Sequence, residues 1–189
     1  MPLGAARFGL LGGVADLGKL ELIETQSMAG ASIVDFTNLG SYNVHFMTMN
    51  NFVPSTSSNE APECRLSNNG GSSFISSGYQ YAFQYGGSTG TFGEGRGTSA
   101  TTITGFPYIN DEGNSGFYIY FYNLLDSSKY SYSTHHSMDY RGDNVYSGQS
   151  FAIFGSNVLT TAETHNAIRF FSSNNVTSAD FSLYGIAES

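Results

Sequence analysis

The sequence predicts an all-β fold: an antiparallel two-sheet sandwich, jelly-roll-like, with an extended N-terminal arm. Aromatic residues make up 15% of the 189 residues, and the 23 Gly and 4 Pro separate short runs rich in Tyr, Phe, Ile and Thr. Runs of this kind between turn signals are typical of sandwiches and jelly rolls. No segment shows helical periodicity beyond one turn at residues 161–164, and no internal repeat indicates a propeller.

Length and composition divide the chain into an arm and one domain. Residues 1–18 are apolar, small and glycine-rich. The segment is either a flexible or partly ordered terminus or an arm that packs on a neighbouring subunit. The arm is the functional hypothesis, because a free tail this apolar is poorly matched to solvent. Residues 19–189 are expected to form the β-sandwich domain, because this length supports one sizeable core. The contact residues expected in the arm are Arg7, Phe8, Leu10 and Leu11.

The expected strands are short runs of β-branched and aromatic residues bounded by turn residues. In chain order they are residues 20–25, 33–36, 42–49, 63–67, 79–85, 100–104, 116–123, 129–134 (extending towards 138), 151–154, 158–160, 166–171 and 179–186.

The last two strands are expected to pair as an antiparallel hairpin around the polar turn at residues 172–175. In the second of them, Ala179, Phe181 and Leu183 fall on one face, and polar residues fall between them. This period-two pattern predicts that Phe181 and Leu183 are buried in the sandwich.

Two further strands alternate clearly. Residues 42–49 place Tyr42, Val44 and Phe46 on the expected inner face, and the four aromatic residues of 79–85 share one side. The glycine cluster at residues 86–97 predicts a mobile loop. Its Gly-x-Gly-x-Gly run lacks the Lys-Ser/Thr and the helix that a phosphate-binding loop needs.

Charge and hydropathy exclude several classes of function. The formal net charge is −8, and the 7 Lys and Arg residues are spread singly, so no basic stripe is present for nucleic acid. No window approaches the ~18 consecutive apolar residues of a membrane helix, so membrane insertion is not expected. The single cysteine, Cys64, has no partner for an intrachain disulfide and is expected to be a small buried core residue.

Two histidines and a nearby carboxylate are the first candidates for a metal site: His135, His136 and Asp139. Adjacent strand residues point to opposite faces, so one ion is not expected to bind both histidines. The isolated residues His45 and His165 are expected to lie at the surface or to be hydrogen-bonded.

Other candidate sites are equally weak. The acidic turn of Asp111, Glu112 and Asn114 lacks the alternating ligands of a dedicated calcium loop. No Gly-x-Ser-x-Gly elbow and no pair of carboxylates facing one cleft is recognisable. The Arg-Gly-Asp tripeptide at 141–143 is interpreted as a tight turn, and Asn-Val-Thr at 175–177 is a formal glycosylation sequon. We therefore expect no catalytic residues, no metal and no cofactor.

Three stretches resemble a known group of proteins. They are residues 36–42 (Phe-Thr-Asn-Leu-Gly-Ser-Tyr), 65–71 (Arg-Leu-Ser-Asn-Asn-Gly-Gly) and 182–186 (Ser-Leu-Tyr-Gly-Ile). With the strand and turn pattern of residues 33–186, the chain resembles small virion structural proteins of tailed bacteriophages, especially of marine phages. The resemblance implies a β-sandwich located on the virion, as a head decoration, head fibre or tail appendage.

The expected function is therefore a non-enzymatic virion component whose partners are capsid or tail proteins and further copies of itself. Tyrosine-rich strands give large contact areas at low entropy cost, with ordinary core packing as the alternative for each residue. A carbohydrate-binding module for attachment to a host-surface glycan is the second hypothesis, although the absence of Trp counts against it. An enzyme such as a depolymerase is third. The strand residues expected in subunit contacts are Tyr79, Tyr81, Tyr85, Tyr118, Tyr120 and Tyr122.

Overall fold

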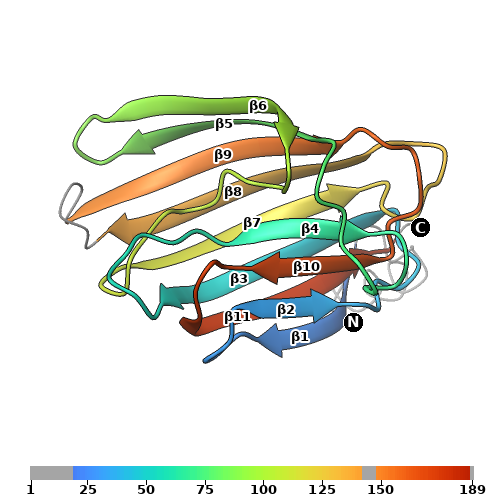
Figure 1. Ribbon diagram of the computed structural model, residues 1–189, viewed down its shortest axis with the longest axis horizontal. Coiled ribbons are helices and arrows are strands. Elements are labelled where there is room, and N and C mark those ends of the chain that lie inside the picture. Colours follow the sequence, from blue (N-terminus) through green and yellow to red (C-terminus); the bar gives the residue numbers. More distant parts are fainter. Residues whose placement is uncertain (1–18, 142–147, 188–189) are drawn as a thin grey trace, which may run out of the picture.

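The chain folds into two antiparallel β-sheets (Figure 1). The computed structural model describes residues 19–141 and 148–187, which form eleven strands and no helix. The eight strands of the large sheet, in spatial order, are β1 (Leu20–Ser27), β11 (Val176–Ile186), β3 (Val44–Pro54), β7 (Asn114–Tyr122), β8 (Ser131–Arg141), β9 (Gln149–Leu159), β5 (Tyr79–Gly87) and β6 (Phe92–Ala100). The three strands of the small sheet, in order, are β2 (Ile33–Phe36), β10 (Ala167–Phe171) and β4 (Glu63–Ser67). The predicted all-β, two-sheet class is confirmed.

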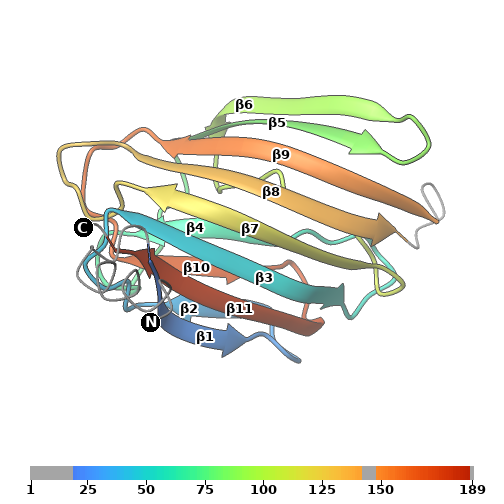
Figure 2. The same cartoon turned by 180° about the vertical axis from the view of Figure 1, so that it is seen from behind.

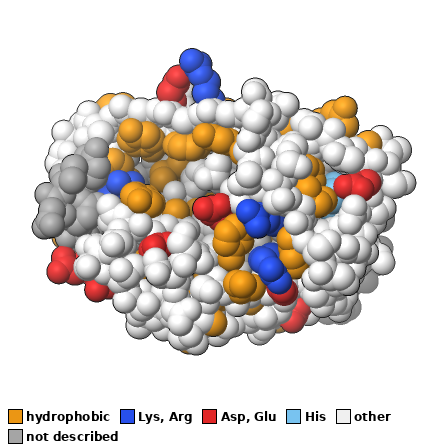
Figure 3. Space-filling model, in the orientation of Figure 1, with side chains coloured by type: hydrophobic (Ala, Val, Ile, Leu, Met, Phe, Trp, Pro, Cys, Tyr) orange, Lys and Arg blue, Asp and Glu red, His pale blue; other side chains and the backbone are white. Residues whose placement is uncertain are grey.

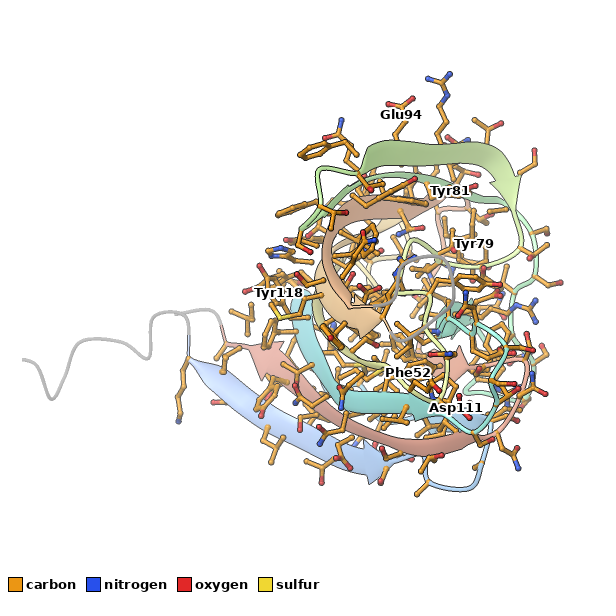
Figure 4. The ribbon with its side chains drawn as sticks, turned by 90° about the vertical axis from the view of Figure 1, so that its left-hand side faces the viewer. Phe52, Tyr79, Tyr81, Glu94, Asp111 and Tyr118 are labelled. Carbon is orange, nitrogen blue, oxygen red and sulfur yellow. The ribbon has the colours of Figure 1, made fainter. Side chains whose placement is uncertain are left out.

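The small sheet lies on one face of the large sheet, over β1, β11, β3 and β7; we call this face the inner face and the opposite face the outer face (Figures 1 and 2). The core lies between the sheets. The ring of Phe170 from β10 lies 5.2 Å from that of Phe181 on β11 and 5.4 Å from that of Phe117 on β7. Figure 4 shows Tyr79 and Phe52 inside the curve of the large sheet, and Tyr118 on its outer side.

The loop of residues 101–113 extends the core beyond the small sheet. Its Phe106 ring packs against Phe117 and Phe170, with centroids 4.7 and 6.0 Å away. The Asn157 side chain of β9 donates to the carbonyl of Thr104 and accepts from its amide. The buried polar residues of β8 and β9 are thus covered by backbone groups that satisfy part of their hydrogen bonding.

The closing pair of strands is arranged differently from the prediction. β10 pairs with β2 and β4, whereas β11 pairs with β1 and β3, so the expected hairpin is wrong. The apolar faces of both strands instead meet across the core. This arrangement removes more apolar surface from water than a two-stranded hairpin would. The predicted burial is confirmed, because Phe181 is 1% exposed and Leu183 is completely buried.

The glycine cluster at residues 86–97 is mostly strand, so the expected loop is wrong. Only the turn between β5 and β6 is irregular, and β6 takes the place of the strand expected at 100–104. Three glycines of β6 lie opposite Tyr81, Phe83 and Tyr85, whose rings cover them. A Cβ added at Gly95 would lie 2.2 Å from the Phe83 ring. Glycine therefore serves here to admit a ring against an edge strand, which is a known way to stabilise such a position.

The orientation expected for Val44 and Phe46 is reversed, whereas the Tyr42 ring lies over Gly185 of β11 and beside His45. His45, Met47 and Met49 are completely buried on the inner face, whereas Val44 and Phe46 are half-buried on the other side. Both sets are largely apolar, so the alternation shows two faces without showing which is inner. The two short strands expected at 151–154 and 158–160 form the single strand β9, and no helical turn occurs at residues 161–164.

Candidate binding surface

The outer face of the large sheet is left uncovered by the described residues (Figure 2). Strand register places large side chains from neighbouring strands side by side on it. Tyr184 of β11, Phe46 of β3 and Tyr120 of β7 form one row. In the next row, Tyr118 of β7, His136 of β8 and Phe154 of β9 are neighbours.

These rings contact one another across five strands. The Phe46 centroid lies 6.0 Å from Tyr184 and 4.8 Å from Tyr120. The imidazole of His136 stacks on Phe154 at 4.1 Å, and its Nδ1 is 2.9 Å from the Tyr118 hydroxyl. We call this set the outer aromatic band; its members are Phe46, Tyr118, Tyr120, Tyr122, His136, Phe154 and Tyr184.

The band is partly exposed, with five of its seven members half-buried, and it is free of acidic and basic side chains other than His136. Tyr118 is 41% and Phe154 56% exposed. On the outer face of β3, β7, β8 and β9 the described residues include no Asp, Glu, Lys or Arg. A contiguous exposed aromatic surface of this kind is typical of a contact site.

The opposite side of the molecule is different. Charged side chains gather over the small sheet (Figure 3), where Arg169 of β10 donates to both carboxylate oxygens of Asp35 at 2.7 Å. The guanidinium of Arg169 also lies 4.1 Å from the Phe74 ring centroid. Arg169 and Asp35 thus form an ion pair on this side, whereas the described residues on the outer face of β3, β7, β8 and β9 include no Asp, Glu, Lys or Arg.

A groove of about 1260 Å³ opens on the outer face beside the band. Phe92 of β6 borders it on one side, and Met138 and Tyr140 of β8 border it on the other. Its lining includes the small residues Gly86 and Ala152 between these large side chains. Glu94, which Figure 4 shows on the outside of β6, also lies at this groove.

The metal-site candidates are separated as expected. His136 lies on the outer face, whereas His135 lies on the inner face and its Nε2 donates to the carbonyl of Gly105 at 2.8 Å. Asp139 is buried and pairs with Arg141 at 3.1 Å. Within the described ranges no group of three or more His, Cys, Asp or Glu residues is placed to hold a metal ion.

Burial controls the protonation of the inner histidines. Desolvation lowers the pKa of His135 from 6.5 to about 4, although its bond to Gly105 opposes the shift. Burial also lowers the pKa of His45 and of His165, which hydrogen-bond to the Leu39 carbonyl and to the Ser131 hydroxyl. These histidines are therefore hydrogen-bonded structural residues of the core.

The remaining candidates have structural surroundings. Cys64 is buried, and burial raises the pKa of its thiol well above the usual value, as expected for a core cysteine. Asp111 and Glu112 are exposed in a turn, whereas Asn114 already belongs to β7. Of the Arg-Gly-Asp tripeptide only Arg141 is described, and its guanidinium lies 4.0 Å from the Phe151 ring centroid.

The expected contact residues fall into four groups. Arg7, Phe8, Leu10 and Leu11 lie outside the described residues. Tyr79 is completely buried, and its hydroxyl accepts a hydrogen bond from the amide of Leu66; this corrects its assignment to a subunit contact. The half-buried Tyr81 and Tyr85 lie on the inner face against the glycines of β6, away from the band.

The other three expected residues, Tyr118, Tyr120 and Tyr122, all lie in the outer aromatic band. Sequence reasoning missed Phe46, Phe154 and Tyr184, which join them from other strands. Each shows period-two alternation in its own strand, but only the register between strands brings them together.

Comparisons with known proteins show no family for this chain. No protein-family model and no curated protein matches it. A fructofuranosidase from Schwanniomyces occidentalis shares 6% identity at a TM-score of 0.20, and the match covers 91% of this chain but 35% of that one. The CBM2 module of the evolved Dit of Lactobacillus casei BL23 phage J-1 shares 9% identity at a TM-score of 0.24, covering 95% of this chain and 85% of the module. A laminarinase catalytic domain from Thermotoga petrophila RKU-1 shares 10% identity at a TM-score of 0.22, covering 89% and 75%. Likenesses this weak carry no information about the activity of this chain.

The described residues contain no helix of the length and hydropathy needed to cross a membrane.

Proposed function

We propose that this protein is a non-enzymatic structural subunit of a tailed-phage virion that associates with further copies of itself through the outer aromatic band. The observation that carries the proposal is the partly exposed run of ring contacts from Tyr184 to Phe154, which contains no Asp, Glu, Lys or Arg. The resemblance of residues 33–186 to phage virion proteins supports the location on a particle.

The distribution of charge favours a second copy as the partner. The chain carries a net charge of −8, so two copies repel unless their acidic groups are kept apart. Acidic side chains lie at the margins of the outer face, such as Glu94 on β6 and Asp180 on β11. Two outer aromatic bands therefore meet without placing carboxylates opposite each other, and each buries rings that are well suited to an interface core.

The arrangement of carboxylates supports a non-enzymatic role. Glu94 faces the groove and lies 3.6 Å from Arg96, whereas the Asp139 side chain is buried on the opposite face of the sheet. General acid and base catalysis by a carboxylate pair needs both groups at one cleft. The groove therefore lacks that pair among the residues described.

The proposal predicts the mass of the protein in solution. The 20.3-kDa chain is expected to form oligomers, measured by sedimentation equilibrium over a range of concentrations. Tyr118→Lys is expected to weaken association at least about tenfold, because a lysine at the centre of the contact must lose its hydration.

Tyr108→Lys is the matched control. Tyr108 is 51% exposed but lies in the loop of residues 101–113, on the inner side of the sheet. It should leave the mass unchanged, and circular dichroism should show both variants folded. A wild-type protein that stays monomeric at all concentrations, or equal association of Tyr118→Lys and wild type, contradicts the proposal.

A further inference from the structure

We infer that the outer face carries an extended binding groove for a linear, uncharged oligosaccharide, running along β9 and β5 beside the outer aromatic band. This inference goes beyond the proposed self-association and does not depend on it. The band is centred on β3 and β7, and the groove is centred two to three strands further along the sheet.

The shape of the groove suits a chain and not a single small molecule. The main hollow of about 1260 Å³ shares Gln84, Glu94 and Phe154 with a second of about 510 Å³. The second hollow shares Ala82, Arg96 and Ser156 with a third of about 600 Å³. The hollows therefore continue one another along β5, over roughly 20 Å for the six-residue step from Gly86 to Gln80 at a strand rise of ~3.3 Å.

The strand register explains why the groove exists. Met138, Ala152, Gly86 and Phe92 are successive neighbours across β8, β9, β5 and β6. Two small residues thus lie between two large ones. A Cβ at Gly86 would lie 3.0 Å from the Phe92 ring, so the ring leans over this glycine towards the groove.

Exposed rings supply flat apolar surfaces. Phe92 is 81%, Tyr140 55% and Phe154 56% exposed at the groove. The C–H faces of a sugar ring pack on aromatic faces, whereas its hydroxyls stay free to hydrogen-bond at the edge. These exposed rings bury little apolar area in the folded chain and so contribute little to its stability. Their concentration in one groove therefore favours a role in binding.

Side-chain amides supply the polar partners. Asn50, Gln84 and Asn114 line the groove and are exposed. Within residues 19–141 and 148–187 their side chains make no hydrogen bond, so donors and acceptors are both available to a ligand. An amide offers two donors and an acceptor, which matches the mixed donor and acceptor character of hydroxyl groups.

The charge at the groove selects an uncharged ligand. Its one carboxylate on the outer face, Glu94, has Arg96 as a neighbour at 3.6 Å, so the two charges offset each other. An acidic saccharide would meet Glu94 in a protein of net charge −8, and a cationic ligand would meet Arg96.

The test is titration calorimetry of the full chain against a panel of soluble hexasaccharides. The neutral probes are cellohexaose, laminarihexaose, maltohexaose, xylohexaose and mannohexaose, and the acidic probe is an alginate hexauronate. At least one neutral probe is expected to bind with a micromolar to millimolar dissociation constant. The alginate probe is expected not to bind.

Substitutions in the groove test whether the oligosaccharide binds there. Phe92→Ala and Gln84→Ala should each weaken binding about tenfold, since one lost ring or amide contact is worth about that factor. Phe92→Tyr should retain binding, and the control Tyr108→Ala should leave it unchanged. Lack of binding to every neutral probe, preference for alginate, or unchanged affinity in both groove variants overturns the inference. Tyr118 does not line the groove, so Tyr118→Lys weakens self-association and leaves the groove intact. Binding measured in this variant therefore distinguishes failure of the groove from failure of self-association.

Discussion

Replacing Gly155 with alanine is expected to lower the free energy of unfolding by about 1–3 kcal/mol, as overpacking of a core does. A Cβ at this position would lie 2.2 Å from an atom of the His135 ring. The ring is held by its bond to the Gly105 carbonyl and by the Phe106 ring 4.8 Å away, so it has no free space to move into. Urea denaturation followed by tyrosine fluorescence measures the change.

The expected loss of stability is opposite to the usual effect of this substitution. Alanine in a strand normally stabilises relative to glycine by roughly 0.5–1 kcal/mol, so close approach must outweigh the usual gain. Ser156→Ala, at the next residue and on the outer face, is the control and should change stability little. A Gly155→Ala protein at least as stable as wild type would show that His135 does not lie over β9 in this way.

Lowering the pH from 7 to 4 is expected to remove about 3 kcal/mol of stability through His135 alone. The pKa of this imidazole falls from 6.5 to about 4 because burial disfavours the charged form. Between these values the unfolded chain binds the proton and the folded chain does not. The contribution is therefore complete above pH 6.5 and is lost as the pH falls towards 4.

The second ring nitrogen of His135 explains why the charged form is disfavoured in the folded chain. Nε2 of His135 donates to Gly105, and Nδ1 has no hydrogen-bond partner in the described part of the fold. Protonation would bury a charged donor with nothing to accept from it. His45 and His165, whose pKa values are also lowered, act in the same direction.

His135→Gln separates this contribution from that of the carboxylates. Glutamine keeps a donor for Gly105 but does not titrate. The variant should lose less stability than wild type between pH 7 and pH 4, as measured by urea denaturation at each pH. Equal losses in both proteins would be inconsistent with a buried neutral His135.

Much of the fold follows from local patterns, and the failures have physical causes. Alternation in residues 179–186 correctly gives the buried Phe181 and Leu183. The same rule fails for Val44 and Phe46, because both faces of β3 are apolar. Glycine composition wrongly predicts a loop at residues 86–97. The rings that cover Gly95 and its neighbours come from β5, so this stretch alone does not show that its glycines belong to a strand.

The binding surface could be predicted only in part for the same reason. Tyr118, Tyr120 and Tyr122 alternate within one strand, so a single segment reveals them. Their contacts with Phe46, Tyr184 and Phe154 depend on the order of β11, β3, β7, β8 and β9, which only the folded sheet defines.

Oxidation of Met138 tests the outer face as an association surface most directly. Met138 lies two residues from His136 on the outer face and is 65% exposed, whereas Met28, Met47 and Met49 are completely buried and report on folding. Exposed methionine reacts with peroxide to the sulfoxide, and mass spectrometry measures its rate. The rate at Met138 should fall as wild-type protein is concentrated, should stay high in Tyr118→Lys, and the buried methionines should remain unreacted in both. A Met138 rate that is independent of concentration and equal in the two proteins would contradict association through this face.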